Sequence, residues 1–334
     1  MQFHQLKRRE FITLLGGGAA WPFAAQGQAD KTARIGLMTI SFSTPLSSAG
    51  VKLFVSELSR LGFAEGKNIV IERRELGFGT LDNHKLFADA AELAQSKVDV
   101  MVAVGSEVFL QAAVAASKTI PTVILAINYD PIARGYVKSL AKPGGNITGI
   151  TFRQPELSSK QMELLKEAFP DRDLLAVLYD AESAEQFGMA EAAANAMRVR
   201  IDAVKLENPP YEFELVFRSL VERGSQMVLV LSSGLFTAHR ARIAELAIRY
   251  RLPSMFIFRS YVEAGGLMSY GVDYVPPFAR LADYVAKILK GAKPADLPVE
   301  QVTSFELAIN LKTAKSMGIE FPTSILLRAN TVIE

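Results

Sequence analysis

The feature that most constrains the fold is a regular alternation of apolar runs with amphipathic helical stretches. In the first half, the predicted strands are residues 33–38, 68–72, 98–104 and 121–127, and the predicted helices are 46–61, 81–94 and 109–116. A near-continuous apolar run such as 98–104 is typical of a strand that helices cover on both faces. The alternation therefore predicts a parallel sheet between two layers of helices.

The second half of the chain repeats this layout. Its predicted strands are 174–179, 200–206, 226–231 and 253–258, and its predicted helices are 184–197, 212–223 and 236–250. In both halves a buried strand ends in a pair of Gly and Ser, a helix follows, and a proline opens the next strand. The glycine and the proline are Gly105 and Pro121 in the first half, and Gly234 and Pro253 in the second half. We therefore predict an α/β fold with two similar doubly wound parallel-sheet lobes.

Three segments can carry the chain between the lobes, namely 147–152, 267–271 and 299–307, each next to a Gly- or Pro-containing turn. Lobes joined by several strands form a hinge with a cleft between them. The predicted lobe 1 comprises residues 30–150 plus 273–303, and the predicted lobe 2 comprises residues 151–272 plus 304–334.

The first 29 residues have the three parts of a secretory signal peptide. Lys7, Arg8 and Arg9 are basic, residues 11–29 carry no charge, and small residues precede a predicted cleavage site after Ala29. The paired arginines indicate the twin-arginine export type. The alternative is an uncleaved membrane anchor, but a spanning helix needs about 20 predominantly apolar residues, and glycines and a proline interrupt this stretch.

Composition excludes several classes of function. The net charge of +2 belongs to the leader, so the mature chain is formally neutral, which argues against a nucleic-acid partner. There is no cysteine, which removes disulfides, thiolate metal sites and a lipoprotein anchor. No nucleophile elbow or dinucleotide motif stands in the right context, and the three histidines form no metal-type spacing. We therefore expect no catalytic residue, no metal site and no cofactor.

The candidate ligand-binding residues follow the carboxyl ends of predicted strands, where open α/β sheets bind their ligands. Most are hydroxyls, small residues and aromatics, which suit recognition more than catalysis. They are Ser41, Phe42, Ser43, Gly105, Ser106, Tyr129, Asp130, Tyr179, Phe187, Ser233, Gly234, Phe236 and Arg259. Ser106 and Ser233 occupy matching places in the two lobes, so we expect both to contact a solute. For each residue the alternative is an ordinary cap or turn, and Tyr129 is as well placed for the core.

Several short motifs along the chain support a family resemblance. They are RREFITLLGG at 8–17, LGFAEGKN at 61–68, DP at 130–131, KPGGNITG at 142–149, GGLMSYG at 265–271, ILKGAKPADLP at 288–298 and NLKTAK at 310–315. Together they run over essentially the whole chain. The sequence resembles the substrate-binding components of bacterial ABC transporters, in the family that includes tryptophan- and tyrosine-type binding proteins.

This resemblance implies a type I periplasmic-binding-protein fold with a three-crossover hinge. It also implies capture of a small solute by hinge closure, and delivery to a membrane permease with its ATPase. We expect a monomer in the periplasm that binds an amino acid or a related carboxylate. The alternatives are a sensory binding protein that docks on a receptor and an exported α/β enzyme.

Overall fold

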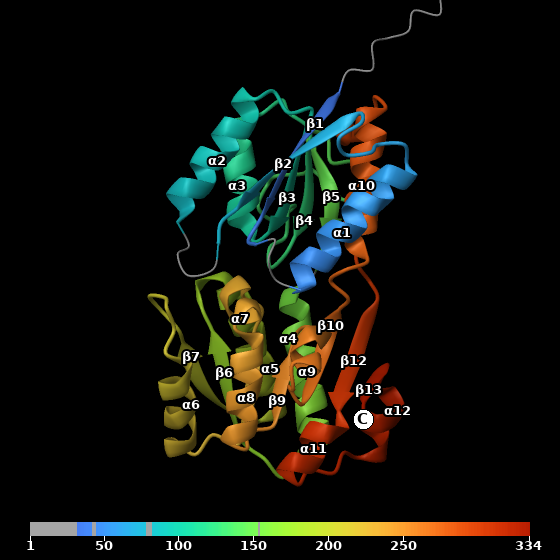
Figure 1. Cartoon of the computed structure of the whole chain (residues 1–334). Helices are drawn as coiled ribbons and strands as arrows, with labels where there is room; N and C mark the ends of the chain where they lie inside the picture. The colour runs from blue at the N-terminus through green and yellow to red at the C-terminus, as the bar shows by residue number, and fades with distance from the viewer. Residues whose placement is uncertain (1–31, 42–44, 78–81, 153) are drawn as a thin grey trace, which may run out of the picture. The chain divides into compact units, whose positions relative to one another are not determined.

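The computed structural model describes residues 32–41, 45–77, 82–152 and 154–334 (Figure 1). The expected signal peptide and the candidate residues Phe42 and Ser43 lie outside this part. Among the helices in these ranges, none is long and apolar enough to cross a membrane.

Lobe 1 is built on a six-stranded sheet in the order β11-β5-β4-β3-β1-β2, in which every pair is parallel. Helices α2 and α3 contact each other on one face, and α1 and α10 contact each other on the opposite face (Figure 1). The elements are β1 (Ala33–Thr39), α1 (Pro45–Arg60), β2 (Ile69–Glu75), α2 (Asn83–Gln95), β3 (Val100–Gly105), α3 (Glu107–Ala116), β4 (Thr122–Ala126), β5 (Ile147–Thr151), α10 (Pro277–Leu289) and β11 (Glu300–Gln301).

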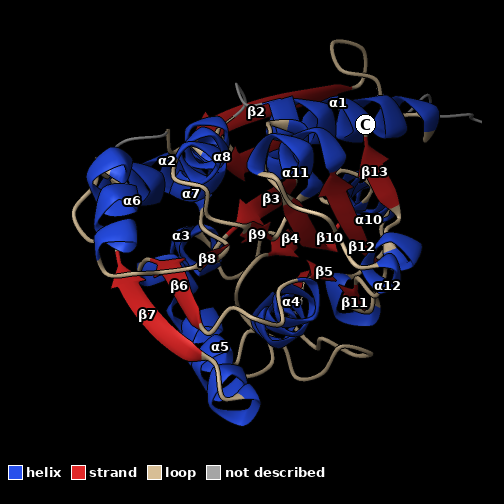
Figure 2. Ribbon diagram, turned by 90° about the horizontal axis from the view of Figure 1, so that it is seen from below, coloured by secondary structure: helices blue, strands red, loops and turns tan. Residues whose placement is uncertain are grey.

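Lobe 2 is built on a seven-stranded sheet in the order β13-β12-β10-β9-β8-β6-β7. Helices α4 and α5 contact each other, as do α6 and α8, and the two pairs lie on opposite sides of the sheet (Figure 2). The elements are α4 (Gln154–Ala168), β6 (Leu174–Tyr179), α5 (Ala184–Met197), β7 (Arg200–Lys205), α6 (Phe213–Glu222), β8 (Met227–Val230), α7 (Gly234–Ala238), α8 (Arg240–Arg249), β9 (Ser254–Phe256), α9 (Arg259–Glu263), β10 (Met268–Val272), β12 (Phe305–Asn310), α11 (Leu311–Met317), α12 (Thr323–Arg328) and β13 (Thr331–Ile333).

Side-chain alternation along the strands explains why both sheets are covered on two faces. In β3, Val100 and Val102 join the core under α1 and α10, whereas Met101 joins the core under α2 and α3. In β6, Leu178 packs towards α6 and α8, and Val177 packs towards α4 and α5. Successive side chains of a strand point to opposite faces, so a central strand such as β3 or β6 must be apolar on both faces. The α/β fold class predicted from the apolar runs is confirmed.

The chain passes between the lobes three times: from β5 to α4, from β10 to α10, and from β11 to β12. The last crossing gives lobe 2 one antiparallel pair, β10 with β12, which the prediction of a wholly parallel sheet did not include. β10 runs towards the hinge, whereas β12 begins at the hinge and runs away from it. The two neighbours therefore have opposite directions.

The predicted helix over residues 236–250 is wrong in one respect, because it is two helices that meet at His239. The backbone of His239 has φ −95° and ψ 15° and ends α7. The carbonyl oxygen of Thr237 accepts a hydrogen bond from the Arg240 guanidinium at 3.1 Å. In a continuous helix this carbonyl oxygen would accept a hydrogen bond from a backbone amide. Here it accepts one from a side chain instead.

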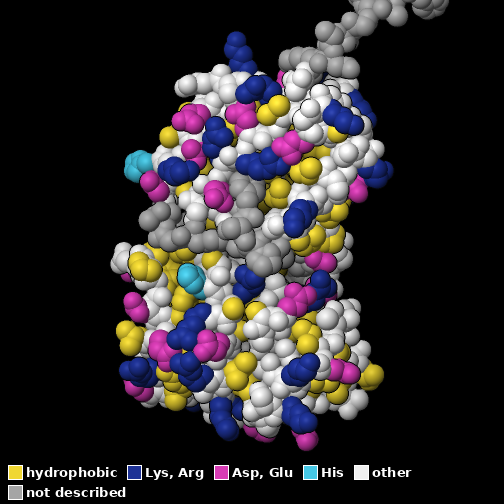
Figure 3. All heavy atoms as spheres, in the orientation of Figure 1, with side chains coloured by type: hydrophobic (Ala, Val, Ile, Leu, Met, Phe, Trp, Pro, Cys, Tyr) yellow, Lys and Arg dark blue, Asp and Glu magenta, His cyan; other side chains and the backbone are white. Residues whose placement is uncertain are grey.

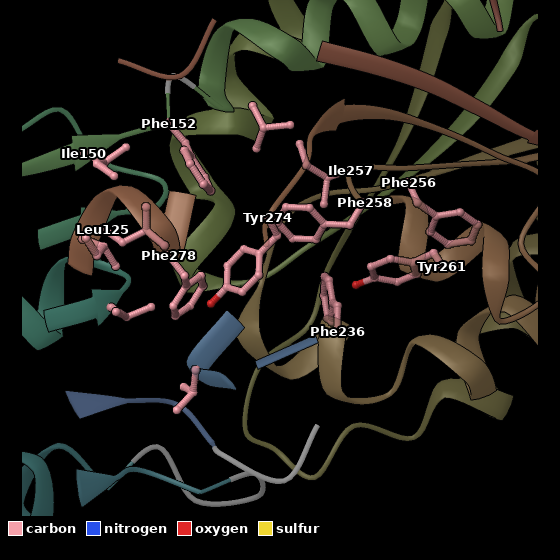
Figure 4. Packing of buried hydrophobic residues seen from close by; sticks show 14 of the residues in the cluster. Leu125, Ile150, Phe152, Phe236, Phe256, Ile257, Phe258, Tyr261, Tyr274 and Phe278 are labelled. Carbon is pink, nitrogen blue, oxygen red and sulfur yellow. The ribbon is translucent and has the colours of Figure 1, made fainter. Parts of the chain in front are cut away.

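An aromatic cluster fills the hinge. The ring of Tyr274, just after β10, lies 5.4 Å from Phe278 of lobe 1, 5.6 Å from Phe258 of lobe 2 and 6.4 Å from Phe152 on the first crossing, measured between ring centroids. Figure 4 shows Tyr274 between Phe278 and Phe258. All four rings are buried and belong to a core that continues through both lobes. The hinge is therefore packed with apolar side chains.

Candidate functional site

A cavity of about 60 Å³, here called the cleft cavity, lies between the carboxyl ends of the two sheets. Both lobes and the hinge contribute to its wall. It is lined by Ile40, Ser47, Val104, Gly105, Ser106, Phe109, Ile127, Asn128, Glu182, Ser232, Ser233, Gly234, Thr237, Phe258 and Tyr274. Because all the strands that contribute loops to it are parallel within their lobe, their ends meet at one edge of each sheet, and the two edges face each other.

Two matching strand-to-helix turns form opposite sides of the cleft cavity. Ser106 is the N-cap of α3 and Ser233 is the N-cap of α7, but neither side chain makes a capping hydrogen bond to its own helix. Both hydroxyls donate instead to carboxylates of lobe 2: Ser106 to Glu182 and Ser233 to Asp180. The cap positions are thus used to hold acidic side chains.

Direct contacts join the two lobes around the cavity. The Ser106 hydroxyl of lobe 1 donates to Glu182 Oε1 at 3.1 Å, and Glu182 Oε2 accepts from the Gly234 amide at 2.9 Å. Asn128 Nδ2 of lobe 1 donates to the carbonyl of Ser232 at 2.8 Å. At a more exposed position, Arg134 of lobe 1 forms an ion pair with Glu185 of lobe 2. Glu182 therefore bridges the lobes from within the cavity wall.

Two acidic side chains in the loop after β6 dominate the electrostatics. Asp180 is 2% exposed and accepts hydrogen bonds from Ser183 Oγ and from the amide of Glu182. Burial raises the pKa of Asp180. Burial also raises the pKa of Glu182, and the charge of Asp180 adds to that increase. Loss of water disfavours the ionised form of both acids.

The polar groups on the wall favour a cationic or hydrogen-donating ligand. Of the described residues that line the cleft cavity, one is a carboxylate, Glu182, and none is a lysine, arginine or histidine. The side-chain oxygen of Asn128 is buried and accepts no hydrogen bond. A group with N–H donors and a positive charge would satisfy both oxygens.

Of the residues predicted from the sequence, the structure brings four together on the cleft cavity: Gly105, Ser106, Ser233 and Gly234. Ser41 is buried just after β1 and does not line this cavity.

The other predicted residues lie elsewhere. Tyr129 is in the lobe 1 core, with its ring against Tyr136, and Asp130 accepts hydrogen bonds from the amides of Ile132 and Ala133 in a turn. Tyr179 stacks on Phe187 with ring centroids 4.1 Å apart. Phe236 packs against Phe213 in the core, and Arg259 lines the second cavity described below.

Sequence reasoning missed Glu182 and Tyr274. Glu182 stands two residues after Asp180 in the strand-end loop that follows Tyr179, so a second carboxylate in that loop was the available indication. Tyr274 follows a strand that crosses between the lobes. The pattern of a strand followed by a loop and a helix marks only loops within one lobe, so it does not mark a residue of the hinge.

A second cavity of about 380 Å³, here called the hinge cavity, adjoins the first and shares Phe258 and Tyr274 with it. It is lined by Ala49, Arg240, Phe258, Arg259, Ser260, Glu263, Ala264, Val272, Asp273, Tyr274, Val275 and Glu306. Pockets for small ligands usually have volumes of roughly 300–1,000 Å³. The cleft cavity is therefore too small for an amino acid in this arrangement, whereas the hinge cavity is large enough.

The family model for ABC transporter substrate binding proteins matches residues 43–333. The chain belongs to this family. A tyrosine-binding protein from Clostridioides difficile (strain R20291) is 26% identical over 272 residues, which are 80% of this chain and 76% of that protein. The two-lobed architecture and the family resemblance expected from the sequence motifs are thus confirmed.

Two solved structures differ in how well they superpose on this substrate-binding protein. An ABC domain from Streptococcus pneumonia in complex with L-Trp has a TM-score of 0.79 at 24% identity, covering 91% of this chain and 100% of that one. The ligand-free, open structure of a substrate-binding protein with adhesive properties from Clostridium difficile has a TM-score of 0.64 at 25% identity, covering 90% and 99%. Identity and coverage are similar, so the lower score reflects a difference in three-dimensional arrangement.

Proposed function

We propose that this protein captures an amino acid in the cleft between its lobes and delivers it to the permease and ATPase of an ABC importer. The observation that carries the proposal is Glu182, a carboxylate in the cavity wall that contacts both lobes and has no cationic neighbour there. An ammonium group is the natural partner of such a carboxylate. Relatives named for tyrosine binding or solved with L-Trp support an amino acid as the solute.

The rest of an amino acid can be assigned to the neighbouring groups. The α-carboxylate would lie at the N-terminus of α3, a helix of ten residues, where free backbone amides and the Ser106 hydroxyl can donate to it. The apolar part of the side chain would lie against Phe109, Phe258 and Tyr274. Binding then requires rotation about the hinge, because the lobes must part to admit a solute larger than the cleft cavity.

Hinge closure by population shift explains the function without covalent chemistry. The open form exchanges solute, and the closed form buries it and presents both lobes to the permease. The better superposition on the L-Trp complex than on the open structure supports a closed arrangement here. We further propose export to the periplasm by the twin-arginine leader and action as a monomer. On the face shown in Figure 3 basic and acidic side chains are mixed, which argues against a nucleic-acid partner.

The proposal is tested by isothermal titration calorimetry against the common amino acids, with small-angle scattering before and after addition of the tightest binder. We expect binding of at least one amino acid with an apolar or aromatic side chain, and a smaller radius of gyration for a sample that starts open. No heat with any amino acid, using protein stripped of solute by unfolding and refolding, would contradict the proposed function.

Ser106→Ala should weaken binding of that amino acid by about 0.5–1.5 kcal/mol, because one hydrogen bond to the solute or to Glu182 is lost.

Ser233→Ala should behave differently. Its hydroxyl is already held by buried Asp180, so the substitution leaves a buried carboxylate short of a donor and should lower the free energy of unfolding by about 1–3 kcal/mol. Calorimetry and thermal unfolding of both variants separate the two effects, and equal losses of stability would contradict this assignment.

A further inference from the structure

Two hydrogen bonds across the cleft join groups that would otherwise face a solute. The Ser106 hydroxyl of lobe 1 donates to Glu182 Oε1 of lobe 2 at 3.1 Å. Asn128 Nδ2 of lobe 1 donates to the Ser232 carbonyl of lobe 2 at 2.8 Å. All four residues line the cleft cavity. Atoms at hydrogen-bonding distance leave no room for a third group between them, so this arrangement excludes a solute from the places where it would bind.

Apolar side chains close around the same two bonds. Ile40 of lobe 1 lies so near Gly234 of lobe 2 that a Cβ added to Gly234 would overlap Ile40 Cδ1. Phe109 of lobe 1 and Phe258 of lobe 2 are buried and line the same cavity. Parting the lobes would expose the apolar atoms of this wall to water, which costs free energy. The hydrophobic effect therefore favours the closed arrangement without any contribution from a solute.

The protein's own groups satisfy nearly all of the cavity wall. Among the described residues that line it, one buried side-chain polar atom has no partner, Asn128 Oδ1. The charged member of the wall, Glu182, accepts hydrogen bonds at both oxygens, from Ser106 and from the Gly234 amide. A buried charge is costly only where it lacks such donors. Closing the lobes on each other thus leaves no charge unpaired.

The cross-cleft bonds can also break without leaving lobe 2 short of donors. When Asn128 leaves, the Ser232 carbonyl still accepts from Gln186 Nε2 at 3.2 Å, and Glu182 still accepts from the Gly234 amide. Asn128 itself has a φ of 67°, in the left-handed region where Asn is among the few side chains tolerated. Its amide can then be hydrated in the open form. Closure is therefore favoured by a modest amount and remains reversible.

We propose that the Ser106–Glu182 and Asn128–Ser232 bonds, here called the cleft latch, hold the lobes closed in the protein without solute and so inhibit its own binding. If each bond favours closure about three- to tenfold, the two together favour it about ten- to hundredfold. A solute then binds only the open fraction, and its apparent dissociation constant rises by the inverse of that fraction. In Ser106→Ala, easier opening offsets part of the lost affinity, which places that loss towards the lower end of its expected range.

The test measures closure directly, on protein stripped of solute by unfolding and refolding. The exposed pair Arg134–Glu185 also spans the cleft. Ile132 lies two residues before Arg134 in lobe 1, and Met189 lies four residues after Glu185 in lobe 2; each is 40% exposed. Because the chain has no cysteine, Ile132→Cys with Met189→Cys attaches two spin labels at these places alone. Pulsed electron resonance then gives the distribution of distances across the cleft.

We expect one predominant short distance in the labelled protein without solute. Asn128→Gly removes the donor and retains a residue that adopts the left-handed backbone readily. Ser106→Ala removes the other donor, whose side chain makes no capping bond to α3. In each variant the ratio of long to short distances should rise by about three- to tenfold, and in the double variant by about ten- to hundredfold.

Asn208→Gly is the matched control. Asn208 also has a left-handed backbone, with φ 56°, but it is exposed and lines neither the cleft cavity nor the hinge cavity, so the short distance should persist. A predominantly long distance in the labelled parent would overturn the latch, as would an unchanged distribution in the double variant or equal opening in Asn208→Gly. The measurement uses no solute, so failure to bind any amino acid would contradict the proposed function and leave this result standing.

Discussion

Gly149→Ala should destabilise the protein by about 3 kcal/mol or more, a large share of the roughly 5–15 kcal/mol that stabilises most native proteins. Gly149 lies in β5 and pairs with Ile124 of β4. Its φ of +138° disfavours any side chain, and an added Cβ would stand 2.2 Å from the carbonyl oxygen of Ile124. Backbone strain and overpacking each cost about 1–3 kcal/mol, and neighbouring backbone in a sheet has little freedom to move away.

The corresponding glycine of lobe 2 should behave in the same way. A Cβ on Gly271 in β10 would stand 2.0 Å from the carbonyl oxygen of Ile257, so Gly271→Ala should cost about 1–3 kcal/mol. Gly149 and Gly271 each belong to a strand that leads out of its lobe to a crossing. Both strands therefore depend on close backbone approach just before the hinge.

Gly145→Ala provides the control for these two substitutions. Gly145 is exposed, and no atom lies within 4 Å of an added Cβ, so the free energy of unfolding should change by less than about 0.5 kcal/mol. Urea unfolding followed by circular dichroism measures all three variants. A Gly149→Ala protein as stable as the Gly145→Ala protein would show that β5 and β4 are not packed as described.

The fold could be predicted from the sequence because its causes are local. The apolar run 98–104 and the amphipathic run 46–61 show their periods within one segment, and β3 and α1 follow them closely. The break at His239 was not predicted, because residues 236–250 contain neither Gly nor Pro to mark it. The antiparallel place of β12 depends on where the third crossing re-enters lobe 2, which no local pattern specifies.

The candidate site could be predicted only in part, for the same reason. Ser106 and Ser233 were found because a strand-to-helix turn has its own sequence pattern. Glu182 and Tyr274 belong to the candidate site through contacts between distant parts of the chain. Ser106 and Glu182, for example, are far apart in the sequence, so no local pattern indicates the hydrogen bond between them. The hydrogen bond from Ser233 to buried Asp180 was likewise not visible in the sequence.

Replacing Glu182 by glutamine should weaken amino-acid binding by about 2 kcal/mol or more, roughly 30-fold, because a buried ammonium would lose its charged partner. The variant retains a side chain of the same size and one oxygen that can accept from Ser106 or from Gly234, which donate to different oxygens of Glu182. Glu185→Gln is the control, since Glu185 also joins the lobes, through Arg134, but lies in an exposed pair outside the cavity. Exposed pairs contribute about 0–1 kcal/mol, so its effect on affinity should be small.

The same carboxylate predicts how affinity depends on pH. Burial holds the pKa of Glu182 in the free protein above its ordinary value of 4.5. A bound ammonium favours the ionised form and lowers that pKa, so the solute-bound protein binds fewer protons than the free protein. Affinity should therefore fall as the pH is lowered through the raised pKa of free Glu182, by up to about tenfold per pH unit for one proton.

Calorimetry across this range, with wild type and Glu182→Gln side by side, checks the assignment. The variant should show a flatter profile, and what dependence remains should come from Asp180, whose pKa burial also raises. Because the ionised forms of both acids are disfavoured in the folded protein, its stability without solute should fall as the pH rises through the same range. Stability and affinity would then change in opposite directions with pH, a pattern that an exposed ion pair does not produce. An unchanged affinity profile in Glu182→Gln would instead place the ammonium away from this carboxylate.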